Sequence, residues 1–191
     1  MDIVTRAKNI LLAPKTEWPV IAGESTSAGS LLTGYVFPLA AIPQIATIIA
    51  GLLRAGALGL MATILIAIVG FVLAIVSVYV LGFIAAKIAP SFGGKDDLSQ
   101  GLKLVAYSYT AAWVAGILNI IPVVGPIIVL IASLYGLYLL YTGVSPVMSV
   151  PKERAVGYTV VVILVAIGVY VVFTIVVGAA VVAMIAATGA R

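Results

Sequence analysis

The chain has 191 residues, of which 64% are hydrophobic and 8% are charged, and its mean hydropathy is +1.31. Soluble proteins are about 45–50% apolar and about 25% charged, so this composition excludes a soluble globular domain and indicates an integral membrane protein. The sequence contains no Cys and no His, which excludes disulfides, thiolate or imidazole metal ligands and histidine-assisted nucleophiles. We therefore expect no metal and no cofactor. The net charge of +4 comes from basic residues scattered singly between apolar stretches, a pattern of membrane orientation rather than of nucleic-acid binding.

Residues 1–30 predict a cytoplasmic amphipathic helix followed by a linker. The apolar residues that share one face of this helix are Ile3, Val4, Ala7, Ile10 and Leu11. Pro14 ends the helix. Arg6 and Lys8 suit an anionic leaflet and Trp18 suits headgroup depth, so these three residues are predicted membrane-interface anchors. Docking of the helix on the ends of the membrane spans is an equal alternative.

Five apolar runs long enough to cross a bilayer form the remaining domain, residues 31–191. The runs cover residues 31–53, 58–86, 102–120, 123–143 and 155–187. A transmembrane helix needs about 20 apolar residues, and irregular backbone cannot face lipid. The predicted fold class is therefore all-α: a polytopic bundle of five transmembrane helices with an N-terminal amphipathic interfacial helix.

The basic residues predict the orientation of the bundle. Eight of the ten Lys and Arg residues fall in the N-terminal segment and in alternate loops: Arg6, Lys8, Lys15, Lys87, Lys95, Lys103, Lys152 and Arg154. The positive-inside rule then predicts a protein of the cell membrane (inner or plasma membrane), with its N-terminus in the cytoplasm and its C-terminus on the outer side.

The interior of the spans argues against two classes of protein. All six Asp and Glu residues lie outside the predicted spans, and Arg54 and Lys87 lie at span ends. Ion-coupled carriers commonly need ionisable groups at membrane depth, and membrane enzymes need a nucleophile with a base or a carboxylate pair. The sequence therefore predicts a protein that is not an enzyme.

Two prolines and an amide mark the first span. Pro38, Pro43 and Gln44 fall within one predicted helix, and each proline removes a backbone hydrogen bond. A helix broken at this depth can line a substrate pocket. The alternative is a bend that serves packing.

Tyrosines concentrate in the predicted cytoplasmic half. Seven of the nine lie there: Tyr35, Tyr79, Tyr107, Tyr109, Tyr138, Tyr141 and Tyr158. One interpretation is a one-sided aromatic belt. The other is a cleft lined by Tyr107, Tyr109, Tyr138 and Tyr141 that receives a lipid, a lipid anchor or a partner helix.

Three stretches carry a family resemblance that covers essentially the whole chain. They are Leu-Leu-Ala-Pro at 11–14 with Trp18 four residues on, Gly-Tyr-Val-Phe-Pro-Leu at 34–39, and Ala-Tyr-Ser-Tyr-Thr at 106–110. Together with five spans, they resemble the prokaryotic branch of the Yip-domain (Ypt/Rab-interacting protein) family. The chain lacks the Asp-Leu-Tyr-Gly-Pro stretch and the long cytosolic arm of eukaryotic members. The resemblance implies a non-enzymatic membrane protein that acts through partners.

Two functions follow as hypotheses. The first is an integral membrane scaffold or adaptor that binds other membrane proteins or lipid anchors through its cytoplasmic half. The second is a small permease, channel or lipid scramblase that uses the proline-broken first span and acts as a homo-oligomer, since five helices are few for a carrier. The expected partners are the lipid bilayer and other membrane proteins, and not nucleic acid.

Overall fold

All regular secondary structure is helical in the computed structural model, which describes the backbone of residues 2–54 and 57–189. Within these ranges, five helical segments are long and apolar enough to cross a membrane: Ala28–Arg54, Thr63–Phe92, Leu98–Ile120, Val124–Met148 and Lys152–Ile175. The predicted all-α fold with five spans is therefore confirmed. The physical reason is that a lipid-exposed segment must satisfy its backbone hydrogen bonds internally, and an apolar run does so as a helix.

The helical elements follow one another with short connections. In chain order they are α1 (Ile3–Leu12), α2 (Pro14–Gly23), α3 (Ala28–Leu31), the π-helical turn η1 (Leu32–Val36), α4 (Phe37–Arg54), α5 (Ala57–Ile88), the 3-10 turn η2 (Ala89–Phe92), α6 (Leu98–Ser108), α7 (Thr110–Ala115), the 3-10 turn η3 (Gly116–Ile120), α8 (Val124–Met148) and α9 (Lys152–Gly189). The third span therefore consists of three pieces, α6, α7 and η3.

The third span forms the core of the bundle. Over its most apolar stretch it buries 67% of its residues, compared with 17–28% in the other four spans. It contacts α4, α5 and α8. A Cβ on Gly82 of α5 would lie 2.8 Å from the Cα of Leu102, so glycine permits the close approach of α5 and α6. The helices around this core turn much of their apolar surface outward, as a bilayer requires.

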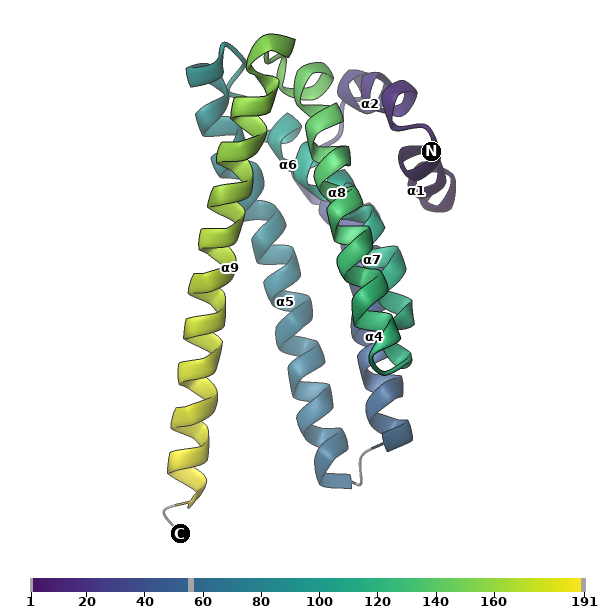
Figure 1. Cartoon of the computed structure of the whole chain (residues 1–191), viewed down its shortest axis with the longest axis vertical. Coiled ribbons are helices and arrows are strands. Elements are labelled where there is room, and N and C mark those ends of the chain that lie inside the picture. The colour runs from purple at the N-terminus through teal and green to yellow at the C-terminus, as the bar shows by residue number, and fades with distance from the viewer. Residues whose placement is uncertain (1, 55–56, 190–191) are drawn as a thin grey trace.

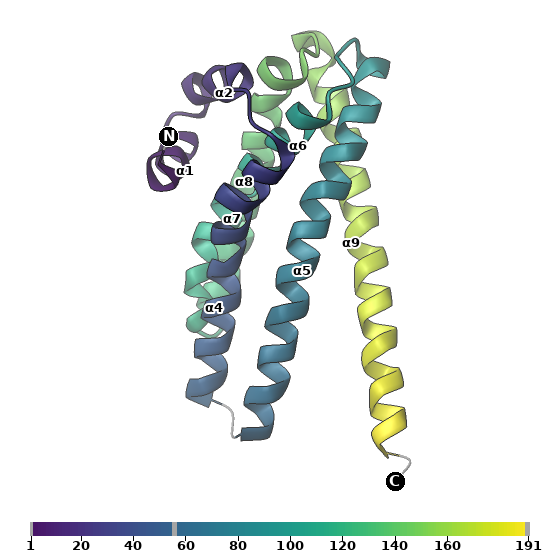
Figure 2. The ribbon, with the colours of Figure 1, turned by 180° about the vertical axis from the view of Figure 1, so that it is seen from behind.

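The ends of the spans gather at two poles (Figure 1). The connection from α5 to α6 and the turn from α8 to α9 lie at the same end as α2, and the view from behind agrees (Figure 2). The C-terminal end of α4, the N-terminal end of α5 and the C-terminal end of α9 lie toward the opposite end. We call the first the α2 end of the bundle.

The first span is not broken at its prolines, which corrects one of the two alternatives drawn from Pro38, Pro43 and Gln44. The wider turn η1 precedes Pro38, and α4 continues through Pro43. A π turn accommodates the proline ring, which otherwise clashes with the carbonyl four residues earlier. A Cβ on Gly116 would lie 2.6 Å from the Cβ of Pro43, and one on Gly70 would lie 2.8 Å from Oε1 of Gln44. These side chains therefore pack against η3 and α5.

The orientation is open to a direct test, because the sequence contains no Cys to mask. Lys95 is exposed at the α2 end, and Val123, which is 74% exposed, directly precedes α8 at the other pole. With the α2 end in the cytoplasm, an impermeant maleimide will label Val123→Cys in intact cells and Lys95→Cys only after permeabilisation. The reverse pattern would contradict the predicted orientation.

Candidate functional site

The N-terminal helix pair, α1 and α2 (residues 3–23), docks on the bundle. The Asp2 side chain accepts a hydrogen bond from the Thr5 backbone N–H at 3.2 Å and begins α1, and Pro14 begins α2. α1 contacts α7, while α2 contacts α6 and α8. Both views place the pair beside α8 (Figures 1 and 2). Of the two alternatives for this segment, the structure has the docked helix.

Trp18 is the centre of this docking, and its prediction as a headgroup anchor is wrong. The side chain is fully buried, and its Nε1 donates to Oγ1 of Thr142 at 3.2 Å. A Cβ on Gly143 would lie 2.6 Å from the Trp18 ring, so glycine provides the space that the ring occupies. A large aromatic ring with one N–H is best satisfied in such a slot with a partner for the N–H.

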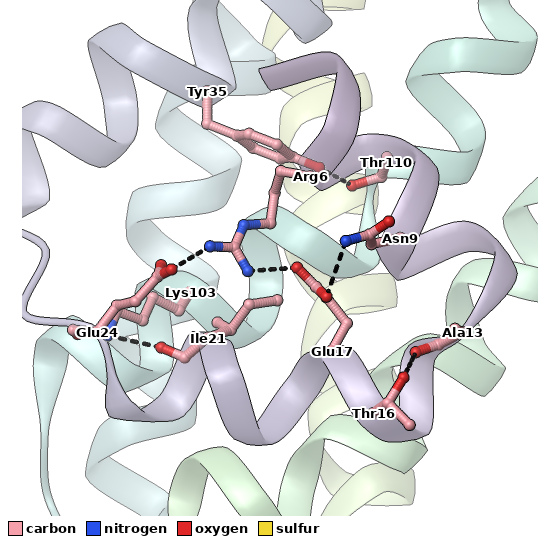
Figure 3. Close-up of polar contacts among 10 residues, drawn as sticks. All are labelled: Arg6, Asn9, Ala13, Thr16, Glu17, Ile21, Glu24, Tyr35, Lys103 and Thr110. Carbon is pink, nitrogen blue, oxygen red and sulfur yellow. Dashed lines mark hydrogen bonds and ion pairs between the residues drawn. The ribbon is translucent and has the colours of Figure 1, made fainter. Parts of the chain in front are cut away.

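Arg6 also points inward, which corrects its prediction as a membrane anchor. It is 4% exposed, and its Nη1 donates to Oε1 of Glu17 at 2.5 Å while Nη2 donates to Glu24 (Figure 3). The other Glu17 oxygen accepts from Asn9 at 3.2 Å. A guanidinium tolerates burial when carboxylates pair with it in this way. Lys8 is exposed on the same helix, and its role as an interface anchor stays a prediction.

Side chains of α6 hold the C-terminal end of α2. Lys103 is 2% exposed, and its Nζ donates to the backbone carbonyls of Ile21, at 3.1 Å, and of Glu24. Nε2 of Gln100 donates to the carbonyl of Ala22 at 2.9 Å. The last carbonyls of a helix have no intrahelical partner and carry partial negative charge. The buried ammonium group of Lys103 therefore gives these carbonyls a hydrogen-bond donor, and the carbonyls in turn give the ammonium group its acceptors.

Tyrosines connect the helix pair to the first span. The hydroxyls of Tyr35 and Thr110 share a hydrogen bond of 2.8 Å, and the rings of Tyr35 and Tyr107 are 4.4 Å apart. The Tyr107 ring also meets the edge of Trp18 at 6.2 Å and lies 5.9 Å from the Arg6 guanidinium carbon. Tyr107 thus contacts α1, α2 and the first span together.

The structure separates the four tyrosines that the sequence grouped into one cleft. Tyr107 lies in the buried cluster, and Tyr109 stacks on Trp113 at 5.6 Å. Tyr138 and Tyr141 are 40% and 43% exposed on α8. The helical phase of α8 explains this, because its buried face is set by its close contacts with α2, α6 and α7.

A cavity of about 220 Å³ opens beside the cluster. Its walls come from α1, the α2–α3 connection, the start of the first span and α6, and they include Arg6, Glu24, Ser30, Tyr35 and Tyr107. We call it the Arg6 cavity. Most of these polar residues are buried, and they also hold the helix pair on the bundle.

Sequence reasoning missed Glu17, Glu24 and Lys103 as site residues. The sequence places Glu17 and Glu24 outside the predicted spans without assigning them a partner, and it counts Lys103 only as a loop charge. One signal was available: in a chain with 8% charged residues, two acidic residues follow Arg6 within one short segment. Near a membrane, burying these charges as pairs costs less free energy than burying them unpaired.

A methyl group at residue 143 tests the docking of Trp18. Gly143→Ala places a Cβ within 2.6 Å of the Trp18 ring, and such overpacking costs about 1–3 kcal/mol. We expect faster trypsin cleavage at Lys15 in α2, because cleavage needs local opening of the helix pair. Gly168→Ala is the control, since nothing lies within 4 Å of its Cβ. Equal cleavage rates for the two variants would contradict the docking.

Removal of the buried guanidinium tests the ion cluster. Arg6→Met leaves Glu17, which is 6% exposed, without its cation, and breaking a buried pair costs about 3–5 kcal/mol. Amide hydrogen exchange in α1 and α2 will accelerate. Lys8→Met, on the exposed face of the same helix, will change protection by no more than about 0.5 kcal/mol. Similar exchange in both variants would refute a stabilising role of the cluster.

Comparison with known proteins identifies the family. Residues 8–175 match the model of the Yip1 domain. No curated protein and no solved structure matches the chain. The match covers all but the ends of the chain and includes α2, the core span and most of α9. The resemblance seen in the sequence is confirmed: the chain belongs to the Yip1 domain family.

Proposed function

We propose that this multi-pass Yip1 domain protein is a non-enzymatic scaffold or adaptor that binds other membrane proteins or lipid anchors through its α2 end, which we place in the cytoplasm. The observation that carries the proposal is a pair of exposed tyrosines, Tyr138 and Tyr141, on a membrane-spanning helix beside the docked helix pair. We call this pair the α8 tyrosine ridge.

The surroundings of the α8 tyrosine ridge favour a binding surface. The Tyr135 hydroxyl donates to the carbonyl of Leu11 at 2.7 Å, and the rings of Tyr135 and Tyr138 are 5.5 Å apart. The helix pair therefore fixes the position of Tyr135, which lies next to the α8 tyrosine ridge. Tyrosine offers a large contact area at low cost in side-chain entropy, and aromatic side chains dominate the energetics of protein interfaces.

The docked helix pair adds a second support. Its inner face is buried, whereas Val4, Leu12 and Val20 are 71%, 73% and 50% exposed on the outside. These residues extend the accessible apolar surface beyond the spans. Exposed apolar surface next to polar residues is a mark of interaction with proteins or membranes.

The alternative of a permease, channel or lipid scramblase depended on a broken first span. Since α4 continues through Pro43 and packs on η3 and α5, that support is lost. The adaptor is therefore the function that the geometry favours.

Site-specific photo-crosslinking tests the adaptor. A photoreactive residue at 138 or 141 will capture the same membrane-protein partner in native membranes, because both positions lie on one ridge. The control position is 170, since Tyr170 is 71% exposed on α9 but lies off the ridge. With the photoreactive residue at 138, we expect the captured band to fall at least about tenfold with Tyr141→Ala, as for an aromatic contact residue, and to persist with Tyr170→Ala. Equal capture from all three positions would contradict the proposal.

A further inference from the structure

Tyr107, which lines the Arg6 cavity, has an accessible hydroxyl without a hydrogen-bond partner among the residues that the structure describes. Tyr107 is 5% exposed and lines the cavity, and its ring is fixed by Tyr35 and Trp18. Among the residues that the structure describes, no group makes a hydrogen bond with the Tyr107 hydroxyl, whereas the Tyr35 hydroxyl is paired with Thr110. Within the same described residues, Oε1 of Gln100 is the one buried side-chain nitrogen or oxygen atom without a partner, so the unpaired Tyr107 hydroxyl is accessible rather than enclosed. The hydroxyl is therefore available to a polar ligand within the cavity.

The cavity wall presents a cation beside an anion. Arg6 uses Nη1 for Glu17 and Nη2 for Glu24, and a guanidinium has five N–H donors, so further donors remain for a ligand oxygen. The Glu24 side chain is 37% exposed, which leaves it accessible from the cavity. The charged residues that line the cavity are therefore one cation, Arg6, and one anion, Glu24. Such a wall complements a ligand that itself carries both charges.

The position of the cavity indicates the source of that ligand. Its walls include Ser30, Leu31 and Gly34, which belong to the first turns of the first span. The end of a span lies at the headgroup region of a bilayer. Beyond Gly34, the exposed side chain of Phe37 continues the surface along the span. A headgroup in the cavity can thus keep its acyl chains in the membrane.

We infer that the Arg6 cavity binds the headgroup of a zwitterionic phospholipid with a primary ammonium group. The phosphate accepts hydrogen bonds from Arg6 and from the Tyr107 hydroxyl, and the ammonium group donates to the Glu24 carboxylate. The lipid thereby fills the junction between the helix pair and the first span. The Arg6 cavity lies apart from the α8 tyrosine ridge, and the lipid can bind there without a protein partner.

The test is lipid binding to the full-length protein in detergent, measured by native mass spectrometry. The probes are phosphatidylethanolamine, phosphatidylcholine, phosphatidylglycerol and free phosphoethanolamine. We expect one phosphatidylethanolamine per protein and at least about tenfold weaker binding of the other three, because a charge-assisted hydrogen bond or the chain anchor is lost in each. Equal binding of phosphatidylglycerol or phosphatidylcholine would overturn the ammonium contact. Equal binding of free phosphoethanolamine would overturn the lipid as the source.

Two variants locate the binding. Gly34→Leu adds a side chain to the cavity wall at a position where nothing lies within 4 Å of a Cβ, and residue 34 takes no part in the ion pairs. It will weaken phosphatidylethanolamine binding at least about tenfold, as expected for a blocked site. Gly168→Leu, which also has open space at its Cβ, will not. Tyr107→Phe keeps the ring and will weaken binding about fivefold through loss of one hydrogen bond.

Hydrogen exchange in α1 and α2 will show whether the variants retain the docked helix pair. With that exchange unchanged, full retention of phosphatidylethanolamine by Gly34→Leu would overturn the site. If Gly34→Leu loosens the helix pair, Tyr107→Phe alone decides, and unchanged binding by that variant would overturn the site. The crosslinks at Tyr138 and Tyr141 report the adaptor separately, so failure of one proposal is distinguishable from failure of the other.

Discussion

Burial of the Arg6 charge is the constraint on which the α2 end depends. A guanidinium that is 4% exposed carries a large desolvation cost unless carboxylates surround it. Glu17 comes from α2 and Glu24 from the connection that follows. The cluster can therefore form only when α1, α2 and the connection that follows α2 adopt one arrangement. This requirement favours one docked geometry over many loosely attached ones.

The third span, which forms the core of the bundle, supplies the residues that the helix pair and the first span contact. Along α6 and α7, Lys103, Tyr107 and Thr110 face the end of α2, the Arg6 side chain and Tyr35 respectively. These residues recur at spacings of three and four, so they share one helical face. The buried third span thus contacts three other segments of the chain. Its own apolar neighbours hold it in place, since residues 101–108 are all buried.

The sequence was sufficient for the spans and insufficient for the docking. Uninterrupted apolar runs dictate helices in lipid, and five helical segments long and apolar enough to cross a membrane are present in the described residues. The roles of Trp18 and Arg6 came instead from average preferences of those residue types for interfaces. Their actual partners include Thr142, which is 124 residues away from Trp18. Contacts at such separation leave no periodic signal in one sequence.

The helix phase of α8 explains why the grouping of tyrosines failed. Tyr107 and Tyr138 lie on different spans, and a residue count along each span does not define which faces meet. The close approach at Gly136 and Gly143 decides it: Cβ atoms there would meet the Ser108 carbonyl oxygen at 2.8 Å and the Trp18 ring at 2.6 Å. Glycine thus orients α8 toward α6 and α2, which turns Tyr138 and Tyr141 outward.

The N-terminal helix pair touches both proposed surfaces. Arg6 of α1 forms part of the cavity wall, and the carbonyl of Leu11 in the same helix accepts the Tyr135 hydroxyl beside the α8 tyrosine ridge. A ligand that binds only the docked arrangement stabilises it by mass action. Occupation of the Arg6 cavity therefore also stabilises the contact that orders Tyr135. Coupling between two sites is reciprocal, so a partner that requires the same docked helix pair strengthens lipid binding in turn.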